Sequence, residues 1–336
     1  MKKTFFYIRI LLSMALTMFF LWIAFRGADP VELQNTMLRL PAAWFFGLFV
    51  LQTFSHVLRA IRWKYLLYPV KKTVSLHGAF SSLMIGFMIN GIIPRAGEIA
   101  RSYVLAKKEN IAASSVLSTV ILERILDVIS FASVLCIVVI LNDDSIVIWF
   151  PSFSGGAWIL EVIGILLLLI FVLLFLKSSI IFLFVKKIAV LFPASSRKKI
   201  DGIMDSFLQG FQASSVWKNY GIIALLTCSI WSVYIVLLYL PMKMFSMEHL
   251  TLTSAATLQI SSGLASAMPT PNGIGSYHSF ITFTLMRVFH VAEASAGAYV
   301  IYTHAIGYLC TLLIGSAYLI KENIHFVDVV KAEQEE

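Results

Sequence analysis

Long apolar stretches, separated by short basic or turn-rich segments, constrain this sequence more than any other feature. Several of them run for roughly 17 to 25 residues, enough for an α-helix to cross about 30 Å of hydrocarbon. Hydrophobic residues make up 59% of the 336 residues and charged residues only 13%, so the chain could not build a water-facing exterior. We therefore predict an all-α polytopic protein, with one transmembrane domain over residues 1–336.

The lysines and arginines gather in the connections between apolar stretches, and their placement predicts the orientation. Cytoplasmic loops collect these residues, which puts both termini on the cytoplasmic side of the cytoplasmic (plasma) membrane. Residues 5–25 follow Lys2 and Lys3 and lack a small-residue cleavage site, which predicts a retained first span. The net charge of +8 then reflects orientation and attraction to anionic lipid rather than nucleic-acid binding.

The alternation of long apolar stretches with basic or turn-rich connections predicts six full spans. They are residues 5–25, 42–56 and slightly beyond, 112–141, 158–176, 220–240 and 294–320. Residues 27–41 and 142–156 are expected as outside loops, and residues 180–192 as an amphipathic interfacial helix in the main cytoplasmic loop.

Two further apolar segments are interrupted by proline and glycine, and they predict re-entrant hairpins. Residues 75–108 break at NGIIPRAGE with both ends inside, whereas residues 250–286 break at PTPNG with both ends outside. The alternative is that both breaks are ordinary loops between full spans. The order span, span, hairpin, span then occurs twice in opposite orientation, as an inverted-topology repeat. Repeat 1 covers about 1–142, repeat 2 about 156–321, and 322–336 form a short cytoplasmic tail.

Irregular backbone at membrane depth must be buried in protein or line a wet cavity, because unpaired amides in lipid cost several kcal/mol. Secondary transporters place their binding sites at such breaks. Pro94 is expected to begin the second arm of the first hairpin, whose free amides could bind an anion. The residues predicted to shape the breaks are Asn90, Pro94, Gly97, Pro269, Pro271, Asn272, Gly273 and Gly275.

Six ionisable residues lie at or just after the first break, at helical spacings of three or four, and their charges sum to zero. They are Arg95, Glu98 and Arg101, expected on one face of the second arm, and Glu123, Arg124 and Asp127 in the next span. Each would cost about 2.5 to 3.5 kcal/mol if unpaired near the bilayer centre. One interpretation is a closed salt-bridge network that pins the hairpin to the span. In the other, a phosphate replaces one carboxylate on an arginine, and the freed carboxylate takes a proton.

Two other groups of residues are weaker candidates. Arg59, Arg62, Trp63 and Lys64 form a basic and aromatic cluster more typical of an interfacial anchor, although Arg62 stays a candidate for headgroup binding. His278 follows the second break and could meet the charged residues, but a single histidine equally fits packing. His304 in the last span is weaker still.

No catalytic motif, metal-ligand spacing or dinucleotide fingerprint is present in the sequence. We therefore predict no cofactor and no metal, and nothing in the sequence supports an enzymatic activity, although an enzyme stays an alternative.

The segments NGIIPRAGEIARSYVLAKK, ILERILD and PTPNGIGSYHSF resemble the flippase-like integral membrane family related to the transmembrane half of lysylphosphatidylglycerol synthases. The resemblance covers essentially the whole chain and implies lipid translocation. This sequence departs from the family pattern at the second break, where the family often has a second glycine and a following glutamate but Asn272 and His278 stand here. The chain ends sixteen residues after Ile320, so an aminoacyl-transfer domain, and lipid lysinylation by this chain alone, are not expected.

The predicted function is a flippase for an anionic, phosphate-bearing or aminoacylated phospholipid or a polyprenyl lipid. Arg62, Arg95, Arg101 and Arg124 would bind the headgroup, and Glu98, Glu123, Asp127 and His278 would position it or titrate. One alternative is an accessory protein that presents a lipid carrier to a glycosyltransferase or lipid-modifying enzyme without moving it. Another is an integral membrane enzyme acting on a lipid headgroup. The expected partners are a membrane lipid and such an enzyme, and no nucleic acid.

Overall fold

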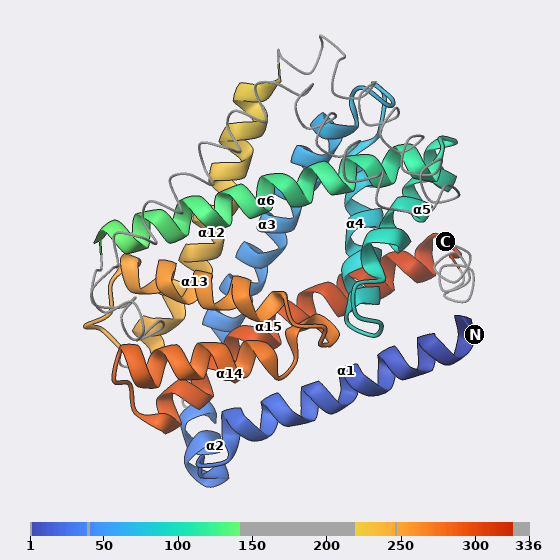
Figure 1. Cartoon of the computed structure of the whole chain (residues 1–336). Helices are drawn as coiled ribbons and strands as arrows, with labels where there is room; N and C mark the ends of the chain where they lie inside the picture. Colours follow the sequence, from blue (N-terminus) through green and yellow to red (C-terminus); the bar gives the residue numbers. More distant parts are fainter. Residues whose placement is uncertain (1, 39–40, 142–218, 246, 325–336) are drawn as a thin grey trace, which may run out of the picture.

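The computed structural model describes residues 2–38, 41–141, 219–245 and 247–324, and its regular structure in these ranges is entirely helical (Figure 1). The α-helices are α1 (Lys2–Phe25), α2 (Pro30–Leu38), α3 (Ala42–Leu67), α4 (Leu76–Asn90), α5 (Gly97–Glu109), α6 (Ala113–Leu141), α12 (Tyr220–Met244), α13 (Leu252–Ser266), α14 (Ser276–Phe283) and α15 (Glu293–Lys321). The predicted all-α class is confirmed for this part of the chain.

Within the described ranges, α3, α6, α12 and α15 are each long and apolar enough to cross a membrane. A fifth candidate is the pair formed by α1 and α2, which is bent by 83° between them. The chain is thus a multi-pass membrane protein, as predicted. The expected span at 158–176, the interfacial helix at 180–192 and the outside loop at 142–156 lie outside the described residues.

The prediction of a loop over residues 27–41 was wrong, because α2 occupies most of it. Asp29 accepts a hydrogen bond from the Val31 amide at 2.8 Å, and Pro30 begins the helix. A side-chain cap followed by proline at the first position is a helix-start signal. The segment is short and only moderately apolar, which hid it from a search for spans.

α4 and α5 flank the first break and pack closely against each other. Gly97 lies so near α4 that an added Cβ would collide with the Gly86 carbonyl oxygen. The Gly97 amide donates to Asn90 Oδ1 at 2.6 Å, so the first amide of α5 is already paired and is not free for an anion. The second arm begins at Gly97 rather than at Pro94, which is buried in the turn.

α13 and α14 flank the second break in the same way. A short 3-10 turn, η2 (Pro271–Gly273), lies within it, and Pro269 before it is exposed. Asn272, Gly273 and Gly275 all have positive φ, at 47°, 76° and 85°. At Gly275 an added Cβ would also come within 2.5 Å of the Thr17 carbonyl oxygen of α1, so only glycine fits there.

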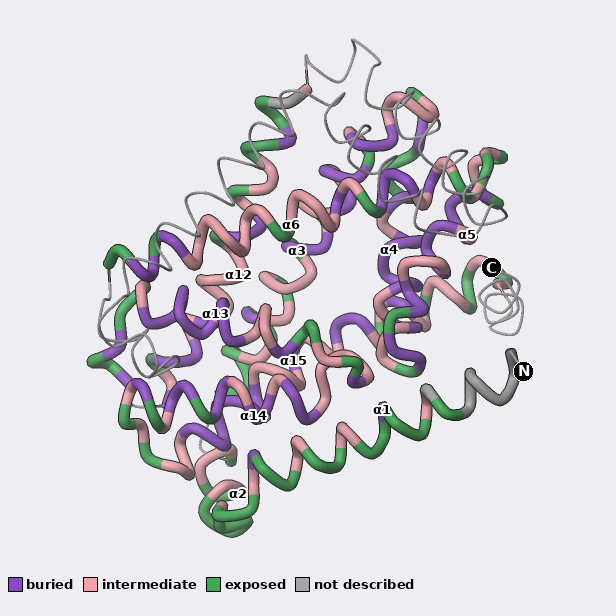
Figure 2. The backbone as a smooth tube through the Cα atoms, in the orientation of Figure 1, coloured by how far each residue is buried: buried purple, intermediate pink, exposed green. Residues whose placement is uncertain are grey.

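The two largest apolar cores of the described residues hold these elements in place. One joins α3, α4, α5 and α6 around Trp63, and the other joins the C-terminal helices around Tyr299. Figure 2 shows buried backbone concentrated on α4, α5 and α13, whereas α1 is largely exposed. On α1, Leu11 and Met18 are 72% and 68% exposed, as expected for a face in contact with lipid.

Candidate functional site

Charged side chains from three helices meet at one place in the interior. Four are arginines and two are carboxylates, and we call them the arginine cluster. Its members are Arg59 and Arg62 on α3, Arg101 on α5, and Glu123, Arg124 and Asp127 on α6.

Glu123 is the centre of the arginine cluster, and its side chain has no exposed surface. Its Oε1 accepts hydrogen bonds from Arg59 Nη2 at 2.6 Å and Arg124 Nη2 at 3.0 Å. Its Oε2 accepts from Arg101 Nη1 at 2.8 Å. A buried carboxylate requires such compensation, and these bonds tie α3, α5 and α6 together.

Asp127, the other carboxylate of the arginine cluster, is only partly buried, since its side chain is 22% exposed. Arg62 Nη2 donates to its Oδ1 at 2.7 Å, and Arg124 Nη2 lies 3.3 Å from its Oδ2. Asp127 and Arg124, whose side chain is 42% exposed, are therefore the accessible pair of the arginine cluster.

Positive charge exceeds negative charge in the arginine cluster, since four guanidinium groups face two carboxylates, a surplus of two. Among the described residues, Arg59 Nε, Arg62 Nε, Arg124 Nε and Arg101 Nη2 are buried without a hydrogen-bond partner. Arg59 also lies over the Phe87 ring at 4.6 Å and Arg101 over the Trp63 ring at 4.9 Å. Surplus charge and unused donors of this kind suit an anionic group.

A cavity of about 740 Å³ lies beside the arginine cluster and is lined by residues of α3, α4, α6, α12, α13, α14, α15 and η2. Arg59, Arg124 and Asp127 line one end of it. Both breaks also reach it, the first through Asn90 and the second through Asn272. A cavity with a mainly apolar wall and a few charged and polar groups thus lies where the two irregular segments meet.

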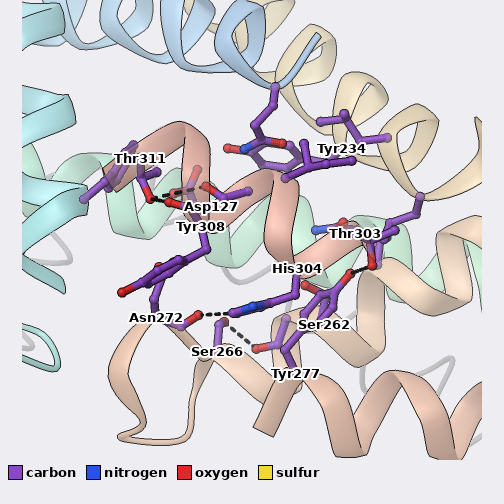
Figure 3. Close-up of a pocket in the computed structure, with 18 of the residues that line it drawn as sticks. Asp127, Tyr234, Ser262, Ser266, Asn272, Tyr277, Thr303, His304, Tyr308 and Thr311 are labelled. Atoms are coloured by element: carbon purple, nitrogen blue, oxygen red, sulfur yellow. Dashed lines mark hydrogen bonds between the residues drawn. The ribbon is translucent and has the colours of Figure 1, made fainter. Parts of the chain in front are cut away.

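The other end of the cavity is neutral, polar and aromatic (Figure 3). Tyr277 Oη donates to Thr303 Oγ1 at 3.0 Å. His304 Nε2 lies 3.1 Å from the Asn272 carbonyl oxygen, which can only accept, so this nitrogen carries the hydrogen. The Tyr308 ring stacks on the His304 ring at 6.1 Å between centroids.

The two breaks contact each other directly. Arg95 Nη2 donates to the carbonyl oxygen of Ala267 at 2.6 Å, and Figure 1 shows the turn between α4 and α5 approaching the end of α13. This single side chain therefore links the first broken segment to the second.

The structure brings together five of the residues predicted to form the site: Arg62, Arg101, Glu123, Arg124 and Asp127.

Arg95, Glu98 and His278 lie elsewhere. Arg95 is exposed with φ of 63° and precedes α5, so the prediction that it shares a helix face with Glu98 and Arg101 was wrong. Glu98 is half-buried on α5 and interacts electrostatically with Arg101, but within the described ranges it forms no ion pair. The His278 ring packs 4.7 Å from that of His304 and 5.6 Å from that of Phe25, not against the arginine cluster.

Arg59 was not predicted as a site residue, and the interpretation of its segment as an interfacial anchor was wrong. Arg62 and Trp63 have no exposed surface, because this end of α3 lies inside the fold. One feature of the sequence could have indicated the site: the polar residues Gln52, His56 and Arg59 lie at positions i, i+4 and i+7, on one face of α3. Such a polar stripe on an apolar span predicts a face turned to the interior.

These features define a multi-pass α-helical membrane protein with an interior cationic cavity. Residues 10–315 match the sequence family described as the lysylphosphatidylglycerol synthase TM region, and the chain belongs to this family.

Three curated relatives are similar over different lengths. The UPF0104 membrane protein MJ1078 of Methanocaldococcus jannaschii is 25% identical over 70% of this chain and 95% of its own length. MJ1595, a UPF0104 membrane protein of the same organism, is 34% identical over 25% of this chain and 26% of its own length. Glycosyltransferase AglD of Haloferax volcanii is 23% identical over 91% of this chain, which spans 53% of that relative. No solved structure matches the chain.

Proposed function

We propose that this chain moves an anionic, phosphate-bearing lipid between the leaflets of the cytoplasmic membrane. The observation that supports the proposal best is the arginine cluster, which carries surplus positive charge and places Arg59, Arg124 and Asp127 on the wall of a 740 Å³ cavity that both breaks reach. Membership of the lysylphosphatidylglycerol synthase TM region family supports a lipid as the substrate.

In this proposal the headgroup enters the cavity while the hydrocarbon tails stay in the bilayer. Arg59 and Arg124 bind the phosphate, because guanidinium donors match phosphate oxygens in pairs. The phosphate replaces Asp127 on Arg124, since Asp127 is the exposed carboxylate of the arginine cluster. Glu123 stays fixed and holds the arginines in position.

The proposed topology keeps both termini in the cytoplasm and includes six full spans. The pairs α4–α5 and α13–α14 enter the membrane from opposite sides as hairpins of two inverted repeats, an arrangement found in secondary transporters. Their packed helix pairs and the contact of Arg95 with Ala267 at the tips are consistent with that arrangement. We propose that this contact opens and closes when the cavity changes the side it faces.

The test is leaflet exchange of a headgroup-labelled anionic phospholipid in vesicles that contain the purified chain. Arg124→Gln should reduce the exchange rate about tenfold or more, because a charge-assisted hydrogen bond contributes about 1.5 to 3 kcal/mol. Lys64→Gln is the matched control, since Lys64 is exposed on α3 and does not line the cavity. Arg101 is a poorer choice because it is buried against Glu123, so its loss would also affect folding. Equal exchange by both variants, or none by the wild-type chain, would contradict the proposal.

A second candidate function is presentation of a lipid to a glycosyltransferase without translocation. It is favoured by the relative named glycosyltransferase AglD, which matches nearly all of this chain with only about half of its own length. In the same vesicles, presentation predicts lipid binding that depends on Arg124 but no leaflet exchange. A chemically altered lipid would instead indicate an enzyme.

A further inference from the structure

We infer that the lipid headgroup recognised by this cavity carries a neutral polyhydroxyl group, a sugar or cyclic polyol, on its phosphate. The inference rests on the proposed anion site and narrows it, because it selects among the headgroups that a phosphate site alone would accept. It also excludes an aminoacyl headgroup as the preferred substrate of this chain.

The first argument is size. A cavity of 740 Å³ falls within the range of about 300 to 1,000 Å³ that small-molecule sites use. A phosphate bound to Arg59 and Arg124 would occupy only one end. The remaining space extends to Asn272 and Tyr277, which lie in the lower part of Figure 3, whereas Asp127 lies in its upper part. The site is therefore built for a group larger than a bare phosphate.

The second argument is charge. Among the described residues that line the cavity, the side chains with a permanent charge at neutral pH are Arg59, Arg124 and Asp127. Asp127 is already bound by Arg62 and Arg124, and no carboxylate of the described ranges lines the end near Tyr277. An ammonium group placed there would lack a counter-ion and would feel the surplus positive charge of the arginine cluster.

The third argument is hydrogen bonding. In the described part of the chain, five neutral side chains on the cavity wall form no hydrogen bond: Gln259, Ser262, Asn272 and Tyr308, which carry amide or hydroxyl groups, and Trp231, whose indole Nε1–H can only donate. Amide and hydroxyl groups both donate and accept, as the hydroxyls of a sugar do. Neutral groups with both capacities suit a polyol better than a carboxylate or an amine.

The fourth argument is the aromatic surface at the same end. Tyr277, His304 and Tyr308 line the cavity together, and the last two are stacked within 16° of parallel. Flat aromatic faces bury large apolar area while their polar edges stay available for hydrogen bonds. Such a surface fits the C–H face of a sugar or inositol ring.

The test compares the binding of four lipids to the detergent-solubilised full chain by native mass spectrometry. Phosphatidylinositol should bind at least tenfold more tightly than phosphatidic acid, because only its ring reaches the neutral end. Lysylphosphatidylglycerol should bind more weakly than phosphatidylglycerol. Equal binding of phosphatidylinositol and phosphatidic acid, or tightest binding of lysylphosphatidylglycerol, would overturn the inference.

Two variants show which end of the cavity distinguishes phosphatidylinositol from phosphatidic acid. Tyr308→Phe keeps the ring and removes the hydroxyl, and it should weaken phosphatidylinositol binding about 2- to 10-fold while leaving phosphatidic acid unchanged. Arg124→Gln should weaken both lipids. Equal loss of both lipids in Tyr308→Phe would contradict recognition of the polyol at this end.

Competition with soluble inositol 1-phosphate shows whether the phosphate-linked polyol that binds in the cavity is a lipid headgroup or a water-soluble molecule. Failure to displace phosphatidylinositol at matched concentration assigns the site to the lipid, and displacement at that concentration assigns it to a water-soluble sugar phosphate. Both results support a phosphate-linked polyol. Selective binding without leaflet exchange would refute the translocator and leave this inference standing. Leaflet exchange that is fastest for lysylphosphatidylglycerol would support the translocator and refute the inference of a polyol headgroup.

Discussion

Replacing Glu123 by glutamine removes the negative charge at the centre of the arginine cluster while keeping the shape of the side chain. In the wild-type chain this carboxylate has no exposed surface and lies within 3.0 Å of guanidinium nitrogens of Arg59, Arg101 and Arg124, and within 3.5 Å of one of Arg62. After the change, four arginines would face Asp127 alone. The surplus of the cluster rises from two positive charges to three.

The expected cost follows from burial. Removing one partner of a buried ion pair costs about 3 to 5 kcal/mol, because the remaining charges stay buried without compensation. That is a large share of the roughly 5 to 15 kcal/mol by which folded proteins are stable. It corresponds to a loss of two to three and a half orders of magnitude in the folding equilibrium. The variant should therefore unfold at much lower temperature or fail to accumulate.

Thermal unfolding of the purified chain in detergent, followed by fluorescence-detected size exclusion, measures this effect. Glu248→Gln is the matched control, because Glu248 is exposed and its carboxylate forms no ion pair within the described ranges, so its loss should change stability by about 0.5 kcal/mol at most. Equal stability of the two variants would refute the reasoning, since Glu123 would then not hold the helices together.

Three more predictions follow from the same structure. Gly97→Ala should destabilise the fold by about 1 to 3 kcal/mol through overpacking of α5 on α4, whereas Gly47→Ala, which meets nothing within 4 Å, should be neutral or stabilising in the same thermal assay. Asp127→Asn should tighten phosphatidic acid binding several-fold in native mass spectrometry, because it removes the carboxylate that competes with the phosphate for Arg124. Weaker binding would contradict the proposal that the phosphate replaces Asp127 on Arg124. Burial alone would raise the pKa of Glu109, but its hydrogen bonds with Lys71 and Ser75 outweigh this and hold that pKa below its usual value. This stabilisation is complete above the unfolded pKa of about 4.3 and is lost as pH falls through the lower folded value, so Glu109→Gln should lose less stability than wild type between about pH 5 and pH 3.

The sequence predicted the parts of this architecture that depend on local pattern. Length and hydropathy were enough to place α3, α6, α12 and α15, because a span must be long and apolar. Glu123 and Asp127 were recognisable as site residues because charges four apart on an apolar helix require partners. The proline and glycine of each break marked where the helices stop.

What the sequence did not predict depends on tertiary contacts. Arg95 was assigned to the face of α5 because nothing local shows that Asn90 pairs with the Gly97 amide and delays the start of the helix. Arg59 was overlooked because a basic and aromatic cluster near a span end is more often interfacial, and only packing shows that this end of α3 is buried. The neutral end of the cavity combines residues of α13, α14, η2 and α15, whose proximity no spacing in the sequence indicates.

The most direct measurement for the central claim is an electron cryomicroscopy structure of the chain in nanodiscs that contain phosphatidylinositol. We predict headgroup density in the cavity, with the phosphate within hydrogen-bond distance of Arg59 and Arg124 and the ring against Tyr308. Lipid headgroups found only at the outer surface of the helices, with the cavity filled by protein side chains, would contradict it.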